Sequence, residues 1–220
     1  MVLVWLRLKN LSYQTLGLDL KQLRLMTCHL GNGCFLAAIR DGRSVDTTMG
    51  FTPMEGLMMG TRSSSVDPGI LIHLMREENC TADELDRLLN KASGLKGISG
   101  VSADMRQILA AIAEGNSRAQ LALDIYVHSL RSGIGAMLAS LGGLDALIFT
   151  VGIGENSPII RTAACEAFQF LGLKLDPEKN IHLHEDVDIA AADSKVRVLV
   201  IHTQEDWVIA RECLYLSSRT

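Results

Sequence analysis

Two glycine-rich turns, about 120 residues apart, each follow an apolar run with β-strand character. The first is 31–33 (Gly-Asn-Gly), after the run 23–28, and the second is 152–156 (Gly-Ile-Gly-Glu-Asn), after the run 145–151. Glycine permits positive φ and lets a ligand approach bare backbone N–H groups. In α/β proteins, such turns at the carboxyl ends of strands hold phosphates and nucleotides. The pair therefore predicts an α/β fold with a nucleotide held from two sides.

The order of the predicted elements indicates one large domain. The pattern predicts three antiparallel strands at the start, with Asp41-Gly42 as the hairpin turn between the second and third. Helices and two further strands follow, which gives the order βββ-α…α-β-α-β-α. This order is typical of a ribonuclease-H-like domain with a mixed five-stranded sheet flanked by helices. Strands are expected over 23–30, 34–39, 44–49, 145–151 and 196–202, helices over 69–78, 81–90, 103–114, 117–141, from 158 onward and over about 205–214, and a loop over 92–102.

Residues 1–22 show no clear periodicity, in contrast to the orderly pattern of 23–220. Two interpretations remain open for this segment: an element that packs on the domain, or the remnant of a missing N-terminal domain. The boundary near residue 22 therefore separates a poorly defined segment from a predicted nucleotide-binding domain.

Composition excludes several classes of protein. The net charge of −4 carries no long block of one sign, which argues against nucleic acid or an anionic membrane as the main partner. The apolar run 1–6 is too short for a membrane span and lacks the features of a signal peptide. Five cysteines without C-x-x-C spacing favour reduced thiols in a cytoplasmic protein over a zinc site or disulfides.

Arg62 ends a glycine-flexible segment, 56–62 (GLMMGTR), that follows the third predicted strand. The planar guanidinium suits bidentate contact with a phosphate or a carboxylate. A transferring phosphoryl group spreads charge over its equatorial oxygens, and a cation of this kind stabilises it. An arginine paired with a surface acid is the alternative, and the sequence leaves both open.

Acidic residues stand near two other predicted element ends. Asp104 and Arg106 follow a Gly/Ser-rich segment, where they either begin a helix or clamp the sugar or base of a nucleotide. Glu205 and Asp206 follow the last predicted strand, where one carboxylate holds Mg²⁺ or where both favour the first turn of the final helix. His29, beside the first turn, either contacts a phosphate or bonds the turn backbone.

Five motifs, in this order, resemble the acetate kinase family. The resemblance covers about residue 20 to the end of the chain, and motifs of this length and number are specific. The family belongs to the acetate and sugar kinase, Hsc70 and actin superfamily, whose members bind ATP between two ribonuclease-H-like domains. The strand order agrees with one such domain. The motifs are TCHLGNG (27–33), SVDTTMGFTPMEGLMMGTRS (44–63), SADMR (102–106), FTVGIGENS (149–157) and HTQED (202–206).

The resemblance implies a role for each matching position. Arg62 matches the arginine that stabilises the transferring phosphoryl group, Glu205 the glutamate that holds Mg²⁺ or Mn²⁺, and Pro53 the proline lining the acetate methyl pocket. The first turn would lie over the ATP phosphates, residues 104–106 would flank the nucleotide, and the second turn would cradle the adenosine. The implied ATP contacts are His29, Leu30, Gly31, Asn32, Gly33, Asp104, Met105, Arg106, Gly152, Ile153, Gly154, Glu155 and Asn156.

The implied reaction is reversible transfer of the γ-phosphoryl group of ATP to acetate, which gives acetyl phosphate and ADP in a cytoplasmic homodimer. Acetate kinases are much longer than this chain, which resembles their C-terminal half and lacks the motifs of the acyl-binding side. We therefore expect nucleotide binding without appreciable turnover. A propionate or butyrate kinase and a non-catalytic nucleotide-binding or dimerisation module are the alternatives. Among the departures from the family pattern, Ser64 stands where the family usually has glycine.

Overall fold

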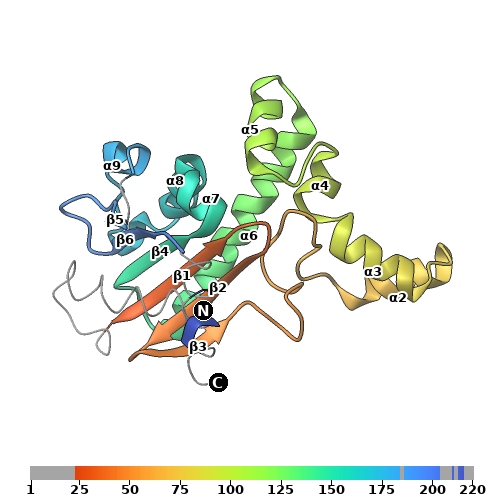
Figure 1. Cartoon of the computed structure of the whole chain (residues 1–220), viewed down its shortest axis with the longest axis horizontal. Helices are drawn as coiled ribbons and strands as arrows, with labels where there is room; N and C mark the ends of the chain where they lie inside the picture. The colour runs from red at the N-terminus through yellow and green to blue at the C-terminus, as the bar shows by residue number, and fades with distance from the viewer. Residues whose placement is uncertain (1–22, 184–185, 204–209, 211–212, 216–220) are drawn as a thin grey trace.

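A six-stranded mixed sheet in the order β3-β2-β1-β4-β6-β5 forms the centre of the computed structural model, which describes residues 23–183, 186–203, 210 and 213–215 (Figure 1). The first three strands form an antiparallel meander, as the sequence predicts. β4 and β6 join parallel to β1, and the short β5 pairs antiparallel with β6. The strands are β1 Arg24–Leu30, β2 Cys34–Arg40, β3 Arg43–Thr47, β4 Ala146–Thr150, β5 Val187–Asp188 and β6 Arg197–Ile201.

The three parallel strands end together at one edge of the sheet. His29 pairs with Thr150 across β1 and β4, and Thr150 pairs with Ile201 across β4 and β6. The first glycine turn follows β1, and helix α7 (Val151–Asn156) follows β4. Sheet register thus brings the two glycine segments to the same edge, as the sequence predicts.

Local capping residues fix several helix starts. Asp67 accepts a hydrogen bond from the Gly69 N–H at the start of α2, and Thr81 forms a capping box with Glu84 at the start of α3. Asn116 caps the long α6. The helices are α2 Pro68–Glu77, α3 Ala82–Lys91, α4 Gly94–Ser99, α5 Met105–Ala113, α6 Ser117–Leu141, α7 Val151–Asn156, α8 Pro158–Glu166 and α9 Pro177–Ile181, with a 3-10 turn at Gln169–Leu171.

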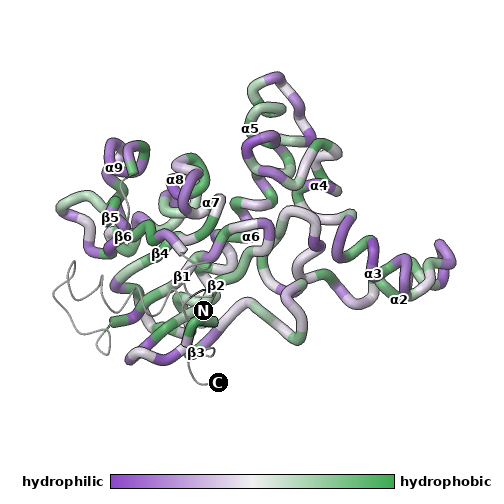
Figure 2. The backbone as a smooth tube through the Cα atoms, viewed as in Figure 1, coloured by the Kyte–Doolittle hydropathy of each residue, from purple (hydrophilic) through white to green (hydrophobic). Residues whose placement is uncertain are grey.

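Helix α6 crosses one face of the sheet and contacts β1, β2 and β3 (Figure 1). Its buried residues recur every three or four positions, which aligns them on one side of the helix. Together with apolar strand residues they form the main hydrophobic core, and Figure 2 shows hydrophobic segments along the central strands. The buried residues of α6 are Ala119, Ala122, Tyr126, Leu130, Ile134, Met137 and Leu141.

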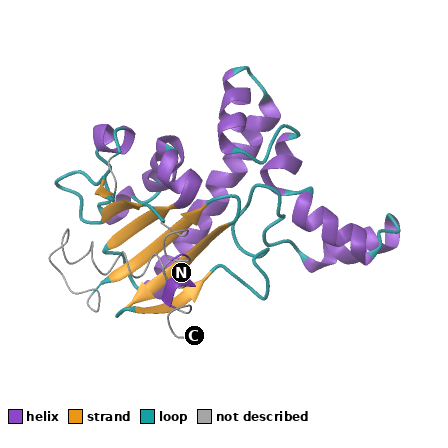
Figure 3. Cartoon of the chain, viewed as in Figure 1, coloured by secondary structure: helices purple, strands orange, loops and turns teal. Residues whose placement is uncertain are grey.

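The α2–α3 pair extends away from the sheet and α6 (Figure 3). α2 contains no buried residue, although Ile70, Ile72 and Met75 are large and apolar. α3 buries Leu85. The pair therefore adds little to the core and stands apart from the elements that position the glycine segments.

Three expectations from the sequence differ from the structure. Residues 92–102, expected to be a loop, contain α4, and the second glycine turn is the helix α7. The sheet has six strands instead of five, because 187–188 add a short edge strand. Each difference involves a segment of at most six residues, where periodicity is too short to assign a state. Residues 1–22 and most of the predicted helix 205–214 lie outside the described residues. Among those that are described, no helix is both long and apolar enough to cross a membrane.

Candidate active site

The first glycine turn is held by bonds within the turn and from the core below it. The Gly31 N–H donates to the Gly33 carbonyl at 3.0 Å, and the Cys34 thiol donates to the Gly31 carbonyl at 3.2 Å. Burial raises the pKa of Cys34 to about 11, so the thiol stays protonated and keeps its donor. Asn32, at the tip, is exposed. The turn is therefore rigid at its base and open at its tip.

Val151 links the two glycine segments. Its φ of +65° is a left-handed conformation that β-branched residues rarely adopt. A Cβ at Gly31 would lie 2.9 Å from Val151 Cγ1, so a larger residue at position 31 would require the valine side chain to shift. Strained backbone of this kind gathers at ligand-binding sites, where the surrounding structure holds it in place.

Two adjoining cavities open around the first turn. The larger, about 530 Å³, lies between the turn, the start of α5 and α7. The smaller, about 230 Å³, lies on the Arg62 side of the turn. They share Gly31 and Asn32, so they meet at the turn. The larger is lined by Gly31, Asn32, Ala103, Asp104, Met105, Arg106, Leu109, Gly152, Ile153, Asn156 and Ser157. The smaller is lined by His29, Gly31, Asn32, Gly33, Cys34, Phe35, Met49, Pro53, Met59, Arg62 and Val151.

Asp104 and Arg106 begin a helix and also line the larger cavity. Asp104 Oδ1 accepts the Arg106 N–H at 2.9 Å, which caps α5, and Asp104 Oδ2 pairs with Arg106 Nη2 at 2.6 Å. Hydrogen bonding to Arg106 lowers the pKa of Asp104, and the same pairing raises the pKa of Arg106. The Arg106 side chain is 89% exposed, so the guanidinium is accessible from solvent. The two interpretations of this pair are compatible.

His29 lies beneath the smaller cavity and is braced on two sides. Its ring stacks on Phe35 with centroids 4.6 Å apart, and Nδ1 lies 3.3 Å from Thr150 Oγ1. The imidazole is therefore fixed by the sheet while it still lines the cavity.

Arg62 projects toward the first turn from the loop 57–66. Its Nη1 donates to the Pro53 carbonyl at 3.2 Å, and a Cβ at Gly33 would lie 3.3 Å from the same nitrogen. The loop is held mainly by main-chain hydrogen bonds. They run from Gly60 N to Asn32 O, Ser63 N to Leu89 O, Ser93 N to Thr61 O, Leu95 N to Met59 O and Lys96 N to Gly60 O.

Gly94 is the point where the start of α4 meets the Arg62 loop. Its φ is +62°, and a Cβ there would lie 2.2 Å from the Met59 carbonyl oxygen and 2.8 Å from the Arg62 carbonyl oxygen.

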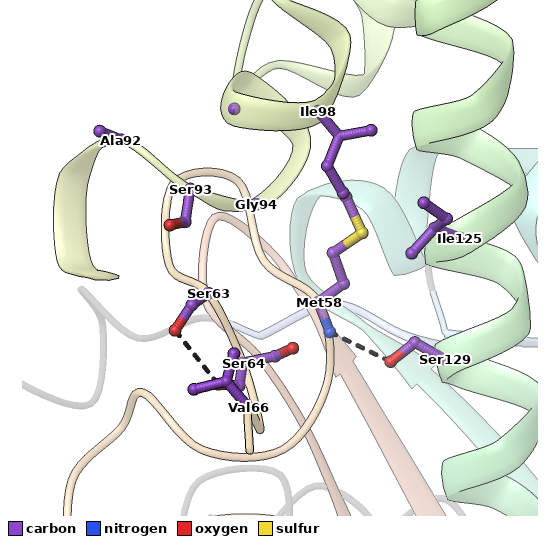
Figure 4. Close-up of a pocket in the computed structure, with 11 residues that line it drawn as sticks. Met58, Ser63, Ser64, Val66, Ala92, Ser93, Gly94, Ile98, Ile125 and Ser129 are labelled. Carbon is purple, nitrogen blue, oxygen red and sulfur yellow. Dashed lines mark hydrogen bonds between the residues drawn. The ribbon is translucent and has the colours of Figure 1, made fainter. Parts of the chain in front are cut away.

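A third cavity, about 380 Å³, lies between the Arg62 loop, α4 and α6, and Ser63 and Ser64 are among the residues that line it. In Figure 4 its serine hydroxyls and apolar side chains surround this space, and the Met58 N–H donates to Ser129 Oγ at 3.2 Å.

Two residues that hold α7 were not recognised in these roles from the sequence. Glu155 turns its carboxylate back onto the chain, where Oε1 accepts the Val151 N–H at 2.7 Å and the Thr203 N–H at 3.0 Å. Arg161, fully buried on α8, donates to the carbonyls of Gly154 and Glu155. No short motif marks Arg161, because its burial follows from packing between α7, α8 and α9.

Most of the sequence-predicted nucleotide contacts line one of the two site cavities. Three of them differ. Leu30 is fully buried in the core, Gly154 is buried, and the Glu155 carboxylate binds backbone N–H groups of this chain. The burial of Leu30 and Gly154 and the hydrogen bonds of Glu155 indicate that these three residues support the cavity walls.

Glu205, the predicted metal ligand, lies outside the described residues. Within the described part of the chain, no group of three or more His, Cys, Asp and Glu side chains is arranged to hold a metal ion. His202, at the end of β6, lies near two carboxylates, with Nε2 4.0 Å from Glu155 Oε2 and Nδ1 3.8 Å from Asp186 Oδ1. The described residues therefore offer no complete protein metal cage.

The site geometry combines a glycine turn, a cavity with an accessible Asp–Arg pair, and an arginine in the adjoining cavity. Comparison with known families gives this arrangement a name. The family model described as "Acetokinase family" matches residues 8–211. The chain belongs to the acetokinase family.

Individual relatives agree with this assignment. The acetate kinase of Trichormus variabilis is 69% identical over 206 residues, which are 94% of this chain and 51% of that protein. The crystal structure of Porphyromonas gingivalis acetate kinase matches with a TM-score of 0.88 and 42% identity, over 96% of this chain and 52% of the other. A propionate kinase from Francisella tularensis matches with a TM-score of 0.83 and 36% identity, over 93% and 52%.

Two facts about extent follow from these matches. The chain spans about half the length of the acetokinases it matches. The family match begins at residue 8, upstream of the first motif recognised in the sequence. The fold predicted from the strand order, a ribonuclease-H-like α/β domain of the actin-like type, is confirmed by the structural neighbours.

Proposed function

We propose that this chain supplies the nucleotide-binding half of an acetate kinase, which transfers the γ-phosphoryl group of ATP to acetate and gives acetyl phosphate and ADP. The observation that carries the proposal is the shared turn. Gly31 and Asn32 line both the larger cavity and the cavity that contains Arg62. A nucleotide in the larger cavity would direct its phosphates over the first glycine turn toward the Arg62 guanidinium.

The larger cavity suits a nucleoside triphosphate. Its volume of about 530 Å³ lies within the usual range for small-molecule sites. The glycine turn lets phosphates approach the backbone closely, and the exposed Asp104–Arg106 pair offers polar contacts to the ribose or base. The apolar side chains of Ile153 and Leu109, which also line the cavity, offer a surface for the base.

Arg62 would stabilise the phosphoryl group during transfer. Positioning and charge stabilisation supply most of the catalysis in such reactions. The guanidinium is directed toward the turn by its bond to the Pro53 carbonyl, and it lies beside Gly33 at the wall of the smaller cavity. Among the described residues, the Arg62 guanidinium donates to the Pro53 carbonyl and to Met59 Sδ and pairs with no surface acid, which favours the phosphoryl role over the alternative from the sequence.

A divalent cation, Mg²⁺ or Mn²⁺, would supply further charge neutralisation. Mg²⁺ is commonly held by one or two carboxylates together with substrate phosphates and waters. We propose Glu205, which lies outside the described residues, as the protein ligand. Among the described residues, Pro53 is the one that the family resemblance assigns to the acyl substrate, and it lines the smaller cavity.

A kinase for propionate is the second candidate, because a propionate kinase shares the fold over most of this chain. Pro53 by itself does not set acyl chain length.

We propose that the chain forms the nucleotide-binding half of each subunit of a cytoplasmic homodimeric enzyme. We also propose that the 220 residues on their own bind ATP without appreciable turnover.

Titration of the 220-residue chain with ATP, paired with two arginine variants, tests the proposal. We expect Arg106→Ala to weaken ATP binding about tenfold, because it removes a charged contact in the nucleotide cavity. Arg62→Ala should leave ATP affinity nearly unchanged, while in a full-length enzyme it lowers kcat by about 10³-fold or more. Arg87→Ala on the distant α3 is the control.

Three outcomes would contradict parts of the proposal. Failure of the wild-type chain to bind ATP would remove the nucleotide-binding function. Robust acetyl phosphate formation by the 220 residues would show that the acyl side is not required from elsewhere. A large loss of ATP affinity in Arg62→Ala would make Arg62 a ground-state phosphate ligand.

A further inference from the structure

Arg161 is a buried cation that the proposed reaction does not use. Its side chain is fully buried, and burial lowers its pKa to about 10, so it remains charged at neutral pH. Placing a charge in the interior is costly unless its hydrogen bonds are satisfied. A buried arginine in this setting therefore needs a reason in the structure.

The guanidinium is satisfied by oxygen atoms of two elements. Nη1 donates to the carbonyls of Gly154 at 2.9 Å and Glu155 at 2.8 Å. Nε donates to Asn180 Oδ1 at 2.8 Å, and Nη2 donates to the Asn180 carbonyl at 2.7 Å. Among the described residues, the oxygen atoms that accept from Arg161 are backbone carbonyls and an amide oxygen, not carboxylates. The contacts therefore join the last turn of α7 to α9.

The carbonyls that Arg161 reaches are those that a helix end leaves without intrahelical partners. α7 has six residues, too few to be stable alone in water, so its position depends on outside contacts. Gly152, Ile153 and Asn156 of α7 line the nucleotide cavity, and Ser157 follows directly. Arg161 thus acts on the back of the same short helix whose front forms the cavity wall.

We infer that Arg161 is a positioning residue for the nucleotide cavity. It holds the end of α7 against α9 and so keeps the cavity wall in the conformation that receives a nucleotide. This inference rests on the proposed function for its consequence on ATP binding, but not for its effect on α7. Lysine cannot replace it, because one ammonium group does not reproduce the planar fork that reaches both α7 and Asn180.

Arg161→Lys is the direct test, with Arg131→Lys as the matched control. Arg131 also donates to a backbone carbonyl, that of Ala163 on α8, but it does not bond α7. We expect Arg161→Lys to weaken ATP binding about tenfold and to speed amide hydrogen exchange in 151–157. Exchange in β1 and β2 should stay unchanged. Arg131→Lys should leave ATP affinity and α7 exchange as in the wild type.

A second variant covers the case in which Arg161→Lys does not fold. Asn180→Ala keeps the guanidinium and removes its Oδ1 acceptor. We therefore expect it to weaken ATP binding and to speed amide exchange in 151–157, each by about threefold. Unchanged ATP affinity and unchanged α7 exchange in a folded variant would overturn the inference. Faster α7 exchange in Arg161→Lys, together with failure of the wild-type chain to bind ATP, would support the positioning of α7 and reject the proposed function.

Discussion

The α7 wall and the Arg62 loop both contact the first glycine turn, yet they are held in different ways. α7 is anchored by charged side chains, Arg161 at its end and Glu155 at its start. The loop is anchored by main-chain hydrogen bonds to 89–96 and by close approach to Gly94, with a cavity of about 380 Å³ behind it. The difference shows that one site can combine two kinds of support. The position of α7 depends on side-chain hydrogen bonds, and the position of the Arg62 loop depends on main-chain hydrogen bonds and on the absence of a side chain at Gly94.

This contrast has a consequence for substitution. A wall held by side chains weakens when a charge or a donor is lost, even if volume is kept. A wall held by its main chain tolerates side-chain changes but not an added Cβ at the contact. The three predictions below test these two behaviours, from the largest expected effect to the smallest.

Gly94→Ala tests the main-chain anchor. A Cβ at this position would overlap the carbonyls of Met59 and Arg62, so we expect a loss of about 4 kcal/mol in the free energy of unfolding. Gly100→Ala is the matched control, because Gly100 has φ +67° but nothing within 4 Å of a Cβ. It should cost about 1 to 2 kcal/mol from backbone strain alone.

Urea denaturation of both glycine variants measures the difference. Equal losses would show that backbone conformation, and not the contact with the loop, determines the cost at Gly94. The Arg62 loop would then not depend on this close approach.

Glu155 tests the side-chain anchor at the start of α7. Glu155→Ala removes the acceptor for the N–H groups of Val151 and Thr203, and we expect a loss of about 2 kcal/mol in unfolding free energy. Glu155→Gln keeps an acceptor oxygen, and it should lose about half as much, on the order of 1 kcal/mol, with little change in ATP affinity. Glu166→Ala, on the exposed end of α8, is the control and should stay within about 0.5 kcal/mol of the wild type.

ATP titration of Glu155→Gln separates two roles for this carboxylate. A large loss of affinity in a stable variant would mean that Glu155 contacts the nucleotide directly, as the family resemblance implies. It would also place the carboxylate in the cavity during binding, away from Val151.

Ser64→Gly should stabilise the protein slightly. Ser64 has φ +67°, a conformation that glycine adopts without steric cost, and the family resemblance implies glycine at this position. Relief of strain, partly offset by the greater freedom of the unfolded chain, gives an expected gain of about 0.5 kcal/mol. Ser63→Gly, beside it in the same cavity wall but without positive φ, should instead lose about 0.5 kcal/mol. A loss in both variants, measured by thermal denaturation, would show that the Ser64 hydroxyl matters more than its backbone.

The sequence predicted those parts of the fold whose signals are local. The meander was marked by Asp41-Gly42, α3 by the capping box at Thr81, and α6 by a long apolar period that ends at Gly142. The short α4 and α7 were missed because six residues give too few repeats to distinguish a helix from a loop.

The candidate site was predicted in part. The glycine turns, Arg62, Asp104 and Arg106 were recognised from motif and resemblance, and the structure brings them to two adjoining cavities. The contribution of Gly94 and Arg161 could not be predicted, because neither lies in a motif and each acts on a segment distant in sequence or on another element.

The sequence by itself determined which residue types stand at the candidate nucleotide site and in which order the strands follow one another along the chain. It did so because turn chemistry, capping and strand alternation depend on neighbours along the chain. Only the tertiary structure decided that the Glu155 carboxylate binds Val151 and Thr203, and that Arg161 is buried behind the cavity wall. These outcomes depend on which elements pack together, and packing sets the direction and burial of a side chain independently of its place in a motif.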